Sequence, residues 1–253
     1  MKIALVQYSP EWENPHDSII KLNSILDKQL SDEELIIFPE MTLTGFTMQA
    51  EKYAEEIDGL GMLYFMSLAR KYKKHIIAGI IEYDEGRIYN SSFHFDGNGI
   101  IMARYRKVHP FSMAKEDKFF SAGREPVVTH IDKIKIGLAV CYDLRFPELY
   151  RLYGKENVDL LITIANWPVS RIEHWKTLLK SRAIENLCYS VGVNRVGDDP
   201  FNKYNGCSAV FDPAGKELAL VEDDEKIITV EIDIEKVKET RDKFPFLNDM
   251  KLL

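Results

Sequence analysis

Short, continuously apolar runs recur along the chain, and most of them are bounded by turn residues or by segments with helical periodicity. Runs of this kind are typical of strands that are buried on both faces. We expect such strands at residues 2–8, 35–38, 75–81, 134–140, 158–165 and 189–194. Apolar positions at helical spacing predict helices between them, at residues 15–30, 60–73, 147–154 and 171–187.

Other segments are shorter and are joined by turn sequences, which favours hairpins. The sequence DGNG at residues 96–99 is a strong turn signal between strands expected at residues 89–95 and 100–105. Further strands are expected at residues 127–131, 207–211, 217–221 and 227–232. Because near-continuous apolar strands need cover on both faces, the pattern predicts an α/β fold with two sheets packed face to face and helices outside. This is a four-layer αββα sandwich.

The composition is that of an ordinary globular chain. The 253 residues are 45% hydrophobic and 29% charged, and no linker, repeat or low-complexity segment interrupts them. We therefore expect one domain over residues 1–253. Its last part, residues 240–253, is charged and partly aromatic, so it could fray or pack at a subunit interface. A net charge of −7 argues against a general nucleic-acid surface.

No apolar run is long enough for the core of a signal peptide or for a membrane span. The three cysteines, Cys141, Cys188 and Cys207, are widely spaced and form no CxxC pair. This predicts no disulfide framework and indicates a reducing cytoplasmic setting. No ligand spacing typical of a metal site is present, so we expect neither a metal nor another cofactor. Core packing is the better interpretation for Cys188 and Cys207.

Three reactive side chains share one kind of position, because Glu40, Lys107 and Cys141 each lie just beyond an apolar run. Cys141 also precedes the helix expected from Pro147, which places it at a strand-to-helix turn. Open α/β sheets bind ligands at the carboxyl ends of their strands. If these strands lie side by side, the three side chains converge. Glu and Lys are rarely buried without a partner, so such a cluster would be mutually supporting.

This combination of side chains predicts acyl transfer. Cys141 supplies a nucleophile, and the helix N-terminus behind it favours the thiolate. Glu40 can take the thiol proton and pass it to a leaving amine. Lys107 and the backbone N–H of Tyr142 can stabilise the oxyanion. Two alternatives are a core role for Cys141 and a thiol-protease dyad with His109, which would leave Glu40 and Lys107 unexplained.

Several longer motifs extend these positions. They are FPEMTLTGF around Glu40, YRKVHPF around Lys107, LAVCYDLRFPELYR around Cys141, and then ANWPVSR, HWKTLLKSRAIEN and GVNRVG. Together they cover most of the chain, which resembles the nitrilase superfamily of carbon–nitrogen hydrolases. The resemblance implies an αββα fold, a Glu–Lys–Cys triad, and homodimers or larger assemblies. It also implies a second glutamate after the lysine that positions substrate, and Glu116 occupies that place.

Within the superfamily, CYDLRFPE and the NWPxxRxxHW run are most similar to the omega-amidase branch. Its enzymes deamidate 2-oxoglutaramate and 2-oxosuccinamate, whose carboxylate lies at the end remote from the amide. A cation near the nucleophile should bind that carboxylate. Arg145 is the first candidate for a bidentate contact and Arg171 the second, although either could form a surface or interface ion pair instead. Phe46 and Trp167 are candidates for the pocket wall, with core packing as the alternative.

The sequence is also compatible with other activities. An N-carbamoyl amino acid amidohydrolase and a nitrilase would use the same thiol, and a catalytically silent assembly or binding module is the alternative without an enzyme. The presence of Glu40, Lys107 and Cys141 together favours an enzyme. The partner expected from the sequence is a small-molecule amide, and neither nucleic acid nor membrane.

Overall fold

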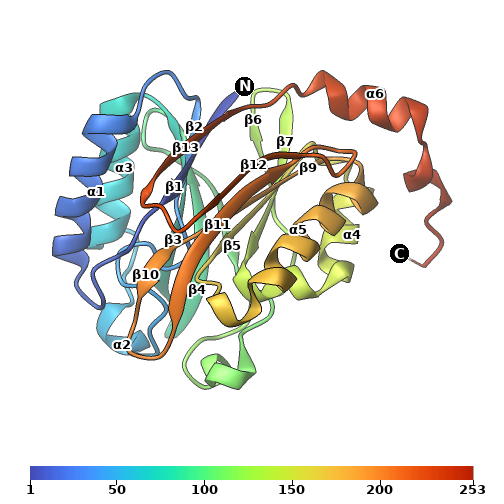
Figure 1. The fold of residues 1–253 in the computed structure, drawn as a ribbon. Helices are drawn as coiled ribbons and strands as arrows, with labels where there is room; N and C mark the ends of the chain where they lie inside the picture. Colours follow the sequence, from blue (N-terminus) through green and yellow to red (C-terminus); the bar gives the residue numbers. More distant parts are fainter. Residues whose placement is uncertain (253) are drawn as a thin grey trace.

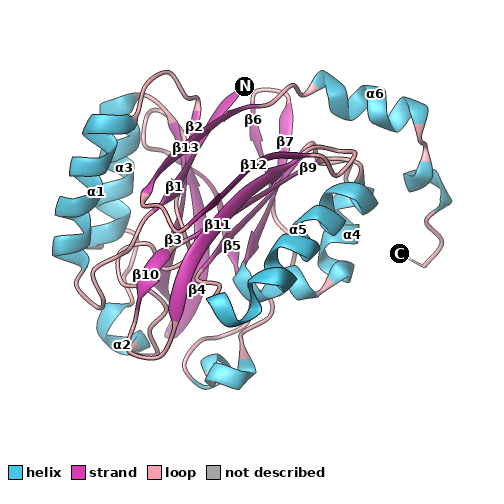
Figure 2. Cartoon of the chain, viewed as in Figure 1, coloured by secondary structure: helices cyan, strands magenta, loops and turns pink. Residues whose placement is uncertain are grey.

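The structure, a computed structural model, describes residues 1–252 and contains two β-sheets packed face to face (Figure 1, Figure 2). The first sheet has six strands in the order β13-β1-β2-β3-β4-β5. Its strands are β1 (Lys2–Gln7), β2 (Leu35–Ile37), β3 (His75–Asp84), β4 (Arg87–Phe95), β5 (Ile101–Arg106) and β13 (Lys226–Glu231). β1, β2 and β3 are parallel to one another, and β13 pairs antiparallel with β1.

The second sheet has seven strands in the order β10-β11-β9-β8-β7-β6, with β12 paired to β11. Its strands are β6 (Val128–Ile131), β7 (Ile134–Val140), β8 (Leu160–Ala165), β9 (Tyr189–Asn194), β10 (Val196–Asp198), β11 (Lys203–Phe211) and β12 (Glu217–Glu222). β7, β8 and β9 are parallel. Together with the helices outside them, the two sheets confirm the αββα architecture.

Helices cover the outer face of each sheet (Figure 1). α1 (Pro15–Gln29) and α3 (Leu60–Tyr72) lie on the first sheet, and α4 (Pro147–Lys155) and α5 (Ile172–Asn186) lie on the second. The other helices are α2 (Ala50–Tyr53), α6 (Glu235–Lys243) and the short 3-10 helices η1 (Ser112–Ala114), η2 (Glu116–Lys118), η3 (Cys141–Arg145), η4 (Val169–Arg171) and η5 (Phe246–Asp249). None of the helices within residues 1–252 is long and apolar enough to cross a membrane.

The side chains of β1 point alternately into two apolar cores, which explains why the predicted strands have no polar face. Ile3 and Leu5 belong to the core between the two sheets, whereas Ala4 and Val6 pack in the core beneath α1 and α3. Successive side chains of a strand point to opposite faces, so a strand between two apolar layers must be apolar throughout. β1 lies between β13 and β2 in the first sheet. Directly before β1, the amino group of Met1 donates to the carbonyl of Ile232 at 3.0 Å.

The C-terminal helix α6 is not predicted by the sequence pattern. Only Val237 is buried in it, so the apolar stripe that identifies the other helices is missing. Arg241 Nη2 donates to the carbonyl of Val158 at 2.6 Å, and this hydrogen bond attaches the helix to the loop between α4 and β8. Beyond it, Phe244 and Phe246 are exposed. A role of residues 240–253 at a subunit interface stays a prediction, and Leu253 lies outside the described residues.

Candidate active site

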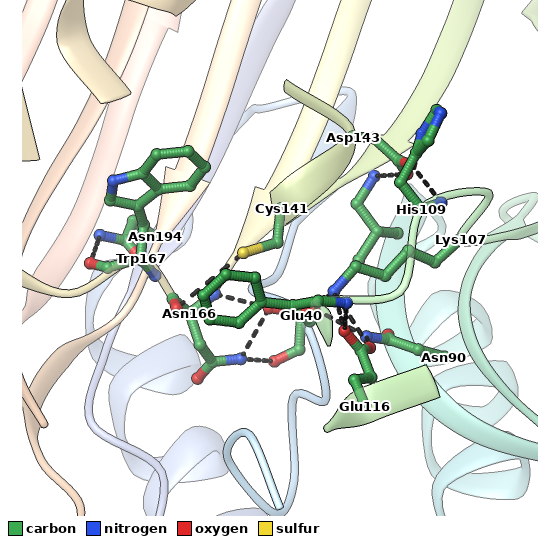
Figure 3. Close-up of polar contacts among 12 residues, drawn as sticks. Glu40, Asn90, Lys107, His109, Glu116, Cys141, Asp143, Asn166, Trp167 and Asn194 are labelled. Carbon is green, nitrogen blue, oxygen red and sulfur yellow. Dashed lines mark hydrogen bonds and ion pairs between the residues drawn. The ribbon is translucent and has the colours of Figure 1, made fainter. Parts of the chain in front are cut away.

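Glu40, Lys107 and Cys141 lie just beyond the carboxyl ends of β2, β5 and β7. These strands do not lie side by side, because β3 and β4 separate β2 from β5, and β7 belongs to the second sheet. β5 nevertheless runs parallel to β2 through two antiparallel pairings, so both strands end at one edge. The three side chains gather there from both sheets (Figure 3).

The loop after β2 holds Glu40 against the neighbouring strand β3. Thr42 N donates to the carbonyl of Gly79 at 2.9 Å, and Gly79 N donates to Thr42 Oγ1 at 3.1 Å. A Cβ at Gly79 would lie 2.7 Å from the Cα of Glu40, so any larger residue would displace this loop. The close packing leaves the Glu40 side chain almost wholly buried.

Lys107 lies between two buried carboxylates. Its Nζ is 2.9 Å from Glu40 Oε1, and it is 3.0 and 2.9 Å from Oε1 and Oε2 of Glu116. All three residues are at most 1% exposed. Glu116 begins η2 and turns inward, so it is not a solvated loop charge. Buried charges are tolerated when they are paired and hydrogen-bonded, and this cluster meets both conditions.

The pKa values of the cluster follow from these contacts. Burial alone would raise the pKa of Glu40, but the charge of Lys107 and hydrogen bonds from Lys107, Asn90 and Asn166 lower it below its ordinary value. Burial would likewise lower the pKa of Lys107, but the carboxylates of Glu116 and Glu40 raise it well above the ordinary range. Glu40 is therefore a carboxylate and Lys107 an ammonium at neutral pH.

Two asparagines that sequence reasoning missed fix the orientation of the carboxylates. Asn90 Nδ2 donates to Glu40 Oε1 at 2.7 Å and to Glu116 Oε1 at 2.8 Å. The backbone N–H of Asn166 donates to Glu40 Oε2 at 2.8 Å, and its Nδ2 donates to the Glu40 carbonyl at 2.6 Å. The signal available in the sequence is weak, since Asn90 is one of several polar residues within β4 and Asn166 directly follows β8.

Cys141 begins η3 and has a left-handed backbone, with φ of +48°. This conformation is uncommon for a residue other than glycine and is found at sharp turns of functional sites. The turn is held by Asp143, whose Oδ2 accepts from Val140 N at 3.0 Å. Figure 3 shows the sulfur directed toward Glu40 and Asn166, and Sγ lies 4.0 Å from the Asn166 carbonyl oxygen.

The environment of Cys141 favours the protonated thiol. Burial raises its pKa, and the negative charge of Glu40 raises it further, so that the pKa lies well above the ordinary value despite Lys107. The expectation from the sequence, that the following helix favours a thiolate, is not met at rest. The helix expected to act, α4, begins only at Pro147, beyond η3, and burial and the nearby carboxylates determine the direction of the pKa shift of the thiol. Attack by this sulfur therefore requires a base.

A cavity of about 620 Å³ opens above the cluster, and Cys141 contributes to its lining. Its wall includes the four residues that the sequence analysis proposed for the substrate pocket, Phe46, Arg145, Trp167 and Arg171, and also Tyr142, whose backbone N–H is the expected oxyanion donor. Most of the other lining residues are apolar or aromatic. Within residues 1–252, no group of three or more His, Cys, Asp or Glu side chains is placed to hold a metal ion. The chemistry that the residues themselves support is nucleophilic attack by sulfur with a buried carboxylate as proton carrier.

The family model described as carbon-nitrogen hydrolase matches residues 2–242. The chain belongs to this family. A 2-oxoglutaramate amidase from Bacillus subtilis (strain 168) is 32% identical over 251 residues, which cover 98% of this chain and 97% of the relative. The omega-amidase YafV from Yersinia enterocolitica is 33% identical over 254 residues, covering 98% and 96% of the two chains.

A solved structure resembles this carbon–nitrogen hydrolase over its whole length. It is XC1258 from Xanthomonas campestris, described as a CN-hydrolase superfamily protein with an arsenic adduct in the active site. The two chains are 32% identical, the TM-score is 0.95, and the match covers 100% of this chain and 98% of the other. The fold and family expected from the sequence motifs are thus confirmed.

The two arginines of this hydrolase lie against aromatic rings of the cavity wall. The Arg145 guanidinium is 4.7 Å from the Trp167 ring centroid, and that of Arg171 is 5.3 Å from the Phe111 ring centroid. Among the described residues neither forms an ion pair with a carboxylate. Partial burial lowers the pKa of Arg145, and the charge of Arg171 lowers it further, which indicates two neighbouring positive charges without a counter-ion.

His109 is held away from a role as the base for Cys141. Its Nδ1 lies 2.8 Å from Asp143 Oδ1, its backbone N–H donates to the same oxygen at 2.9 Å, and its ring stacks on Phe146 with centroids 3.8 Å apart. These contacts support the turn that carries Cys141. The thiol-protease alternative therefore has no geometric basis, whereas the Glu40 carboxylate faces the sulfur.

Proposed function

We propose that this carbon–nitrogen hydrolase is an omega-amidase, which releases ammonia from 2-oxoglutaramate or 2-oxosuccinamate and leaves the 2-oxo diacid. The observation that carries the proposal is a thiol above a buried Glu40–Lys107–Glu116 cluster, in a cavity that also holds two arginines without a counter-ion. Relatives named 2-oxoglutaramate amidase and omega-amidase support the choice of substrate.

Acylation begins with proton transfer from Cys141 to Glu40. The sulfur then bonds to the amide carbon, and the electron pair of the C=O bond moves to the oxygen. Lys107 and the backbone N–H of Tyr142 stabilise this oxyanion, since a positive charge and a donor held at fixed positions act on the charge that develops on the oxygen. The protonated Glu40 next gives its proton to the amide nitrogen, the C–N bond breaks, and ammonia leaves.

Deacylation uses the same carboxylate in the opposite direction. Glu40 takes a proton from a water molecule, the resulting hydroxide attacks the thioester, and the C–S bond breaks with return of the proton to sulfur. Glu116 positions the substrate and helps to keep Lys107 charged through its two contacts with Nζ. No external oxidant, reductant or cofactor enters this scheme.

The activity is tested by an ammonia-release screen over keto-acid amides, N-carbamoyl amino acids, amino-acid amides and nitriles. We expect kcat/KM for 2-oxoglutaramate to exceed that for the other classes clearly. A preference for N-carbamoyl amino acids or for nitriles would replace this proposal by the corresponding alternative. Absence of turnover with every class would leave the catalytically silent binding or assembly module as the better reading.

Substitution of Arg145 by alanine is expected to penalise substrates that carry a remote carboxylate. Loss of charge-assisted hydrogen bonds of about 1.5–3 kcal/mol corresponds to a decrease in kcat/KM of roughly 10- to 100-fold on 2-oxoglutaramate. A short neutral amide should lose little. Steady-state kinetics of both substrates measure the difference, and Arg145→Lys should restore part of the lost activity because it restores the charge.

Arg171→Ala is the matched comparison, because Arg171 lies in the same cavity and is the second candidate for the carboxylate. If Arg171→Ala shows the larger selective loss, the two assignments are exchanged. Equal losses on the acidic and the neutral amide in both variants would mean that the arginines support the wall and do not bind the substrate carboxylate.

Asn90→Leu is expected to move the pH profile as well as the rate. Leucine has a similar shape but cannot donate to Glu40 and Glu116, so the carboxylate form of Glu40 is less stabilised and its pKa rises. Because the mechanism needs ionised Glu40, the acid limb of the kcat/KM profile should shift to higher pH. We expect kcat/KM to fall by about 10- to 100-fold, from the loss of hydrogen bonds to a charged group.

The control for this measurement is Asn23→Leu, because Asn23 accepts a hydrogen bond from Tyr64 away from the cavity. It should leave the pH profile in place. A decrease in kcat for Asn90→Leu without any movement of the acid limb would show that Asn90 only supports the fold.

We also propose that the protein acts in the cytoplasm as a homodimer or larger homo-oligomer. Cys141, Cys188 and Cys207 are all free thiols, which suits a reducing compartment. Light scattering of the purified protein measures the assembly directly, and a monomeric mass across the micromolar range would contradict the oligomer.

A further inference from the structure

The cavity above Cys141 is larger than a small keto-acid amide requires. Its volume of about 620 Å³ lies in the middle of the range of about 300–1,000 Å³ that holds drug-sized ligands. Two of the most exposed large apolar side chains of the molecule line it, since Met113 is 81% and Phe201 80% exposed. Exposed apolar groups that gather at a cavity indicate a binding surface and not merely chance exposure.

One side of the cavity, which we call the arginine wall, is positively charged. It comprises Phe111, Tyr142, Arg145, Trp167 and Arg171. These residues form a connected set, because the rings of Phe111 and Tyr142 lie 4.8 Å apart and each arginine lies over one ring. The wall begins at Tyr142, next to the nucleophile. In the proposed function it holds the acyl part of the substrate and its carboxylate.

A second group of lining residues, which we call the outer wall, is mainly apolar and carries one negative charge. It comprises Trp12, Glu13, Met48, Phe201 and Tyr204. Trp12 and Phe201 make an edge-to-face contact with ring centroids 6.4 Å apart, and Phe201 is mostly exposed, so its ring surface is available to a further aromatic group. The proposed small substrate has no group that would use this surface.

The single charge of the outer wall is held in a fixed position. Thr47 Oγ1 donates to Glu13 Oε1 and Gln49 Nε2 donates to Glu13 Oε2, both at 2.5 Å. Both donors come from the loop that follows Glu40, so the carboxylate is part of the built wall. It would repel an anionic group at this end of the cavity.

The position of Glu40 decides which part of a substrate reaches the outer wall. The leaving nitrogen must face Glu40 to receive its proton. Glu40 and Met48 lie on one loop, and between them Phe46 places its ring 5.3 Å from Lys107 Nζ. The same loop contributes Met48 to the outer wall and holds Glu13 there. The outer wall is therefore the part of the lining that a substituent on the leaving nitrogen reaches along the loop, and the arginine wall remains for the acyl part.

We propose that the site also hydrolyses secondary amides of the same acyl group, in which the leaving amine carries an uncharged apolar or aromatic substituent. This inference rests on the proposed function. The thioester forms and the C–N bond breaks as for the primary amide, but Glu40 transfers its proton to a substituted nitrogen and a primary amine leaves. Water then releases the 2-oxo diacid from Cys141. Amines with a carboxylate are disfavoured by Glu13.

The test compares 2-oxoglutaramate with its N-benzyl and N-carboxymethyl derivatives, and it measures the common product 2-oxoglutarate. We expect kcat/KM for the N-benzyl amide to lie within about tenfold of the value for 2-oxoglutaramate. The N-carboxymethyl amide, which has a similar steric demand at nitrogen but a negative charge, should be at least tenfold poorer than the N-benzyl amide.

Phe201→Ala tests the outer wall itself. Phe201 is mostly exposed, so its removal should leave the fold intact. We expect the ratio of kcat/KM for N-benzyl to kcat/KM for unsubstituted amide to fall about five- to tenfold, the value of a lost aromatic contact. Ile20→Ala is the control. Ile20 is 67% exposed on α1, so this substitution also removes an exposed apolar side chain, but at a site away from the cavity lining. It should leave the ratio unchanged.

The outcomes separate this inference from the proposed function. Turnover of 2-oxoglutaramate with N-benzyl hydrolysis more than about 1,000-fold slower would overturn the inference and leave the function in place. Failure of both substrates would overturn both. An unchanged ratio in Phe201→Ala would show that the benzyl group is not bound at the outer wall, which also contradicts the inference.

Discussion

Substitution of Cys141 by serine or alanine is expected to lower turnover of the amide substrate by about 10⁴-fold or more. The thioester cannot form without the sulfur, and serine is a poorer nucleophile at a carboxylate base whose pKa is held low by Lys107. The fold should survive, since either residue fits the space of Cys141 and meets the same left-handed backbone. Steady-state kinetics and thermal unfolding measure the two effects separately.

Mass spectrometry adds a direct readout for the same residue. After rapid quenching of wild-type protein with substrate, the acyl group should be found on the peptide that contains Cys141. Cys188→Ala is the control, because Cys188 is a buried thiol outside the cavity lining and should be dispensable for turnover. Amidase activity retained in Cys141→Ala would refute the proposed mechanism.

Substitution of Lys107 by methionine should produce the second largest effect, and it should affect both activity and stability. We expect kcat to fall by about 10²–10³-fold or more from the loss of an oxyanion donor. Removing one partner of a buried ion pair typically costs about 3–5 kcal/mol in the free energy of unfolding. Here two carboxylates, Glu40 and Glu116, would lose the only ammonium close to them within residues 1–252.

The sign of the pH effect follows from the same contacts. Lys107 lowers the pKa of Glu40 in the folded protein. The stability that the ion pair contributes is therefore fully present above the pKa of Glu40 in the unfolded chain, and it is lost as the pH falls through the pKa of Glu40 in the folded protein. Without Lys107, burial and the neighbouring negative charge raise the pKa of Glu40. The acid limb of activity and the acid limb of stability should both move to higher pH in Lys107→Met.

A double variant separates the electrostatic role of Lys107 from its catalytic role. Lys107→Met with Glu116→Gln removes one charge of each sign and should recover part of the lost stability but none of the activity. Lys118→Met is the surface control, because Lys118 has 71% of its side chain exposed and should change neither quantity. A change confined to KM in Lys107→Met would mean that Lys107 does not act on the transition state.

The strand ends were predictable from sequence, because buried parallel strands are apolar throughout and stop abruptly at a polar residue. This property located Glu40 and Cys141, whereas Lys107 was found at the end of the second hairpin strand, β5, which is only partly buried and pairs antiparallel with β4. It did not predict how the three residues are arranged in space. The order of strands in a sheet depends on long-range pairing, which the local sequence pattern does not show. The three residues meet because β5 returns parallel to β2 through β4 and because the second sheet lies opposite.

The supporting residues were less visible for a different reason. Asn90 lies within β4 and reads as one polar residue in a mixed segment, and only the folded structure shows that its amide joins two carboxylates. The position of Glu116 came from family resemblance and not from periodicity. The helix α6 was missed because its contacts are made by long charged side chains such as Arg241, which leave no apolar pattern.

The pairing of β1 with β13 has a consequence for how the protein must be made. β1 is synthesised before the other described strands, yet one of its two hydrogen-bonding edges is covered only by residues 226–231. During synthesis that edge therefore stays open until residues 226–231 have emerged, and open edges of apolar strands are templates for aggregation. A chain released before residue 226 would keep this edge exposed, so premature termination near the end should yield insoluble protein even though every active-site residue is already present.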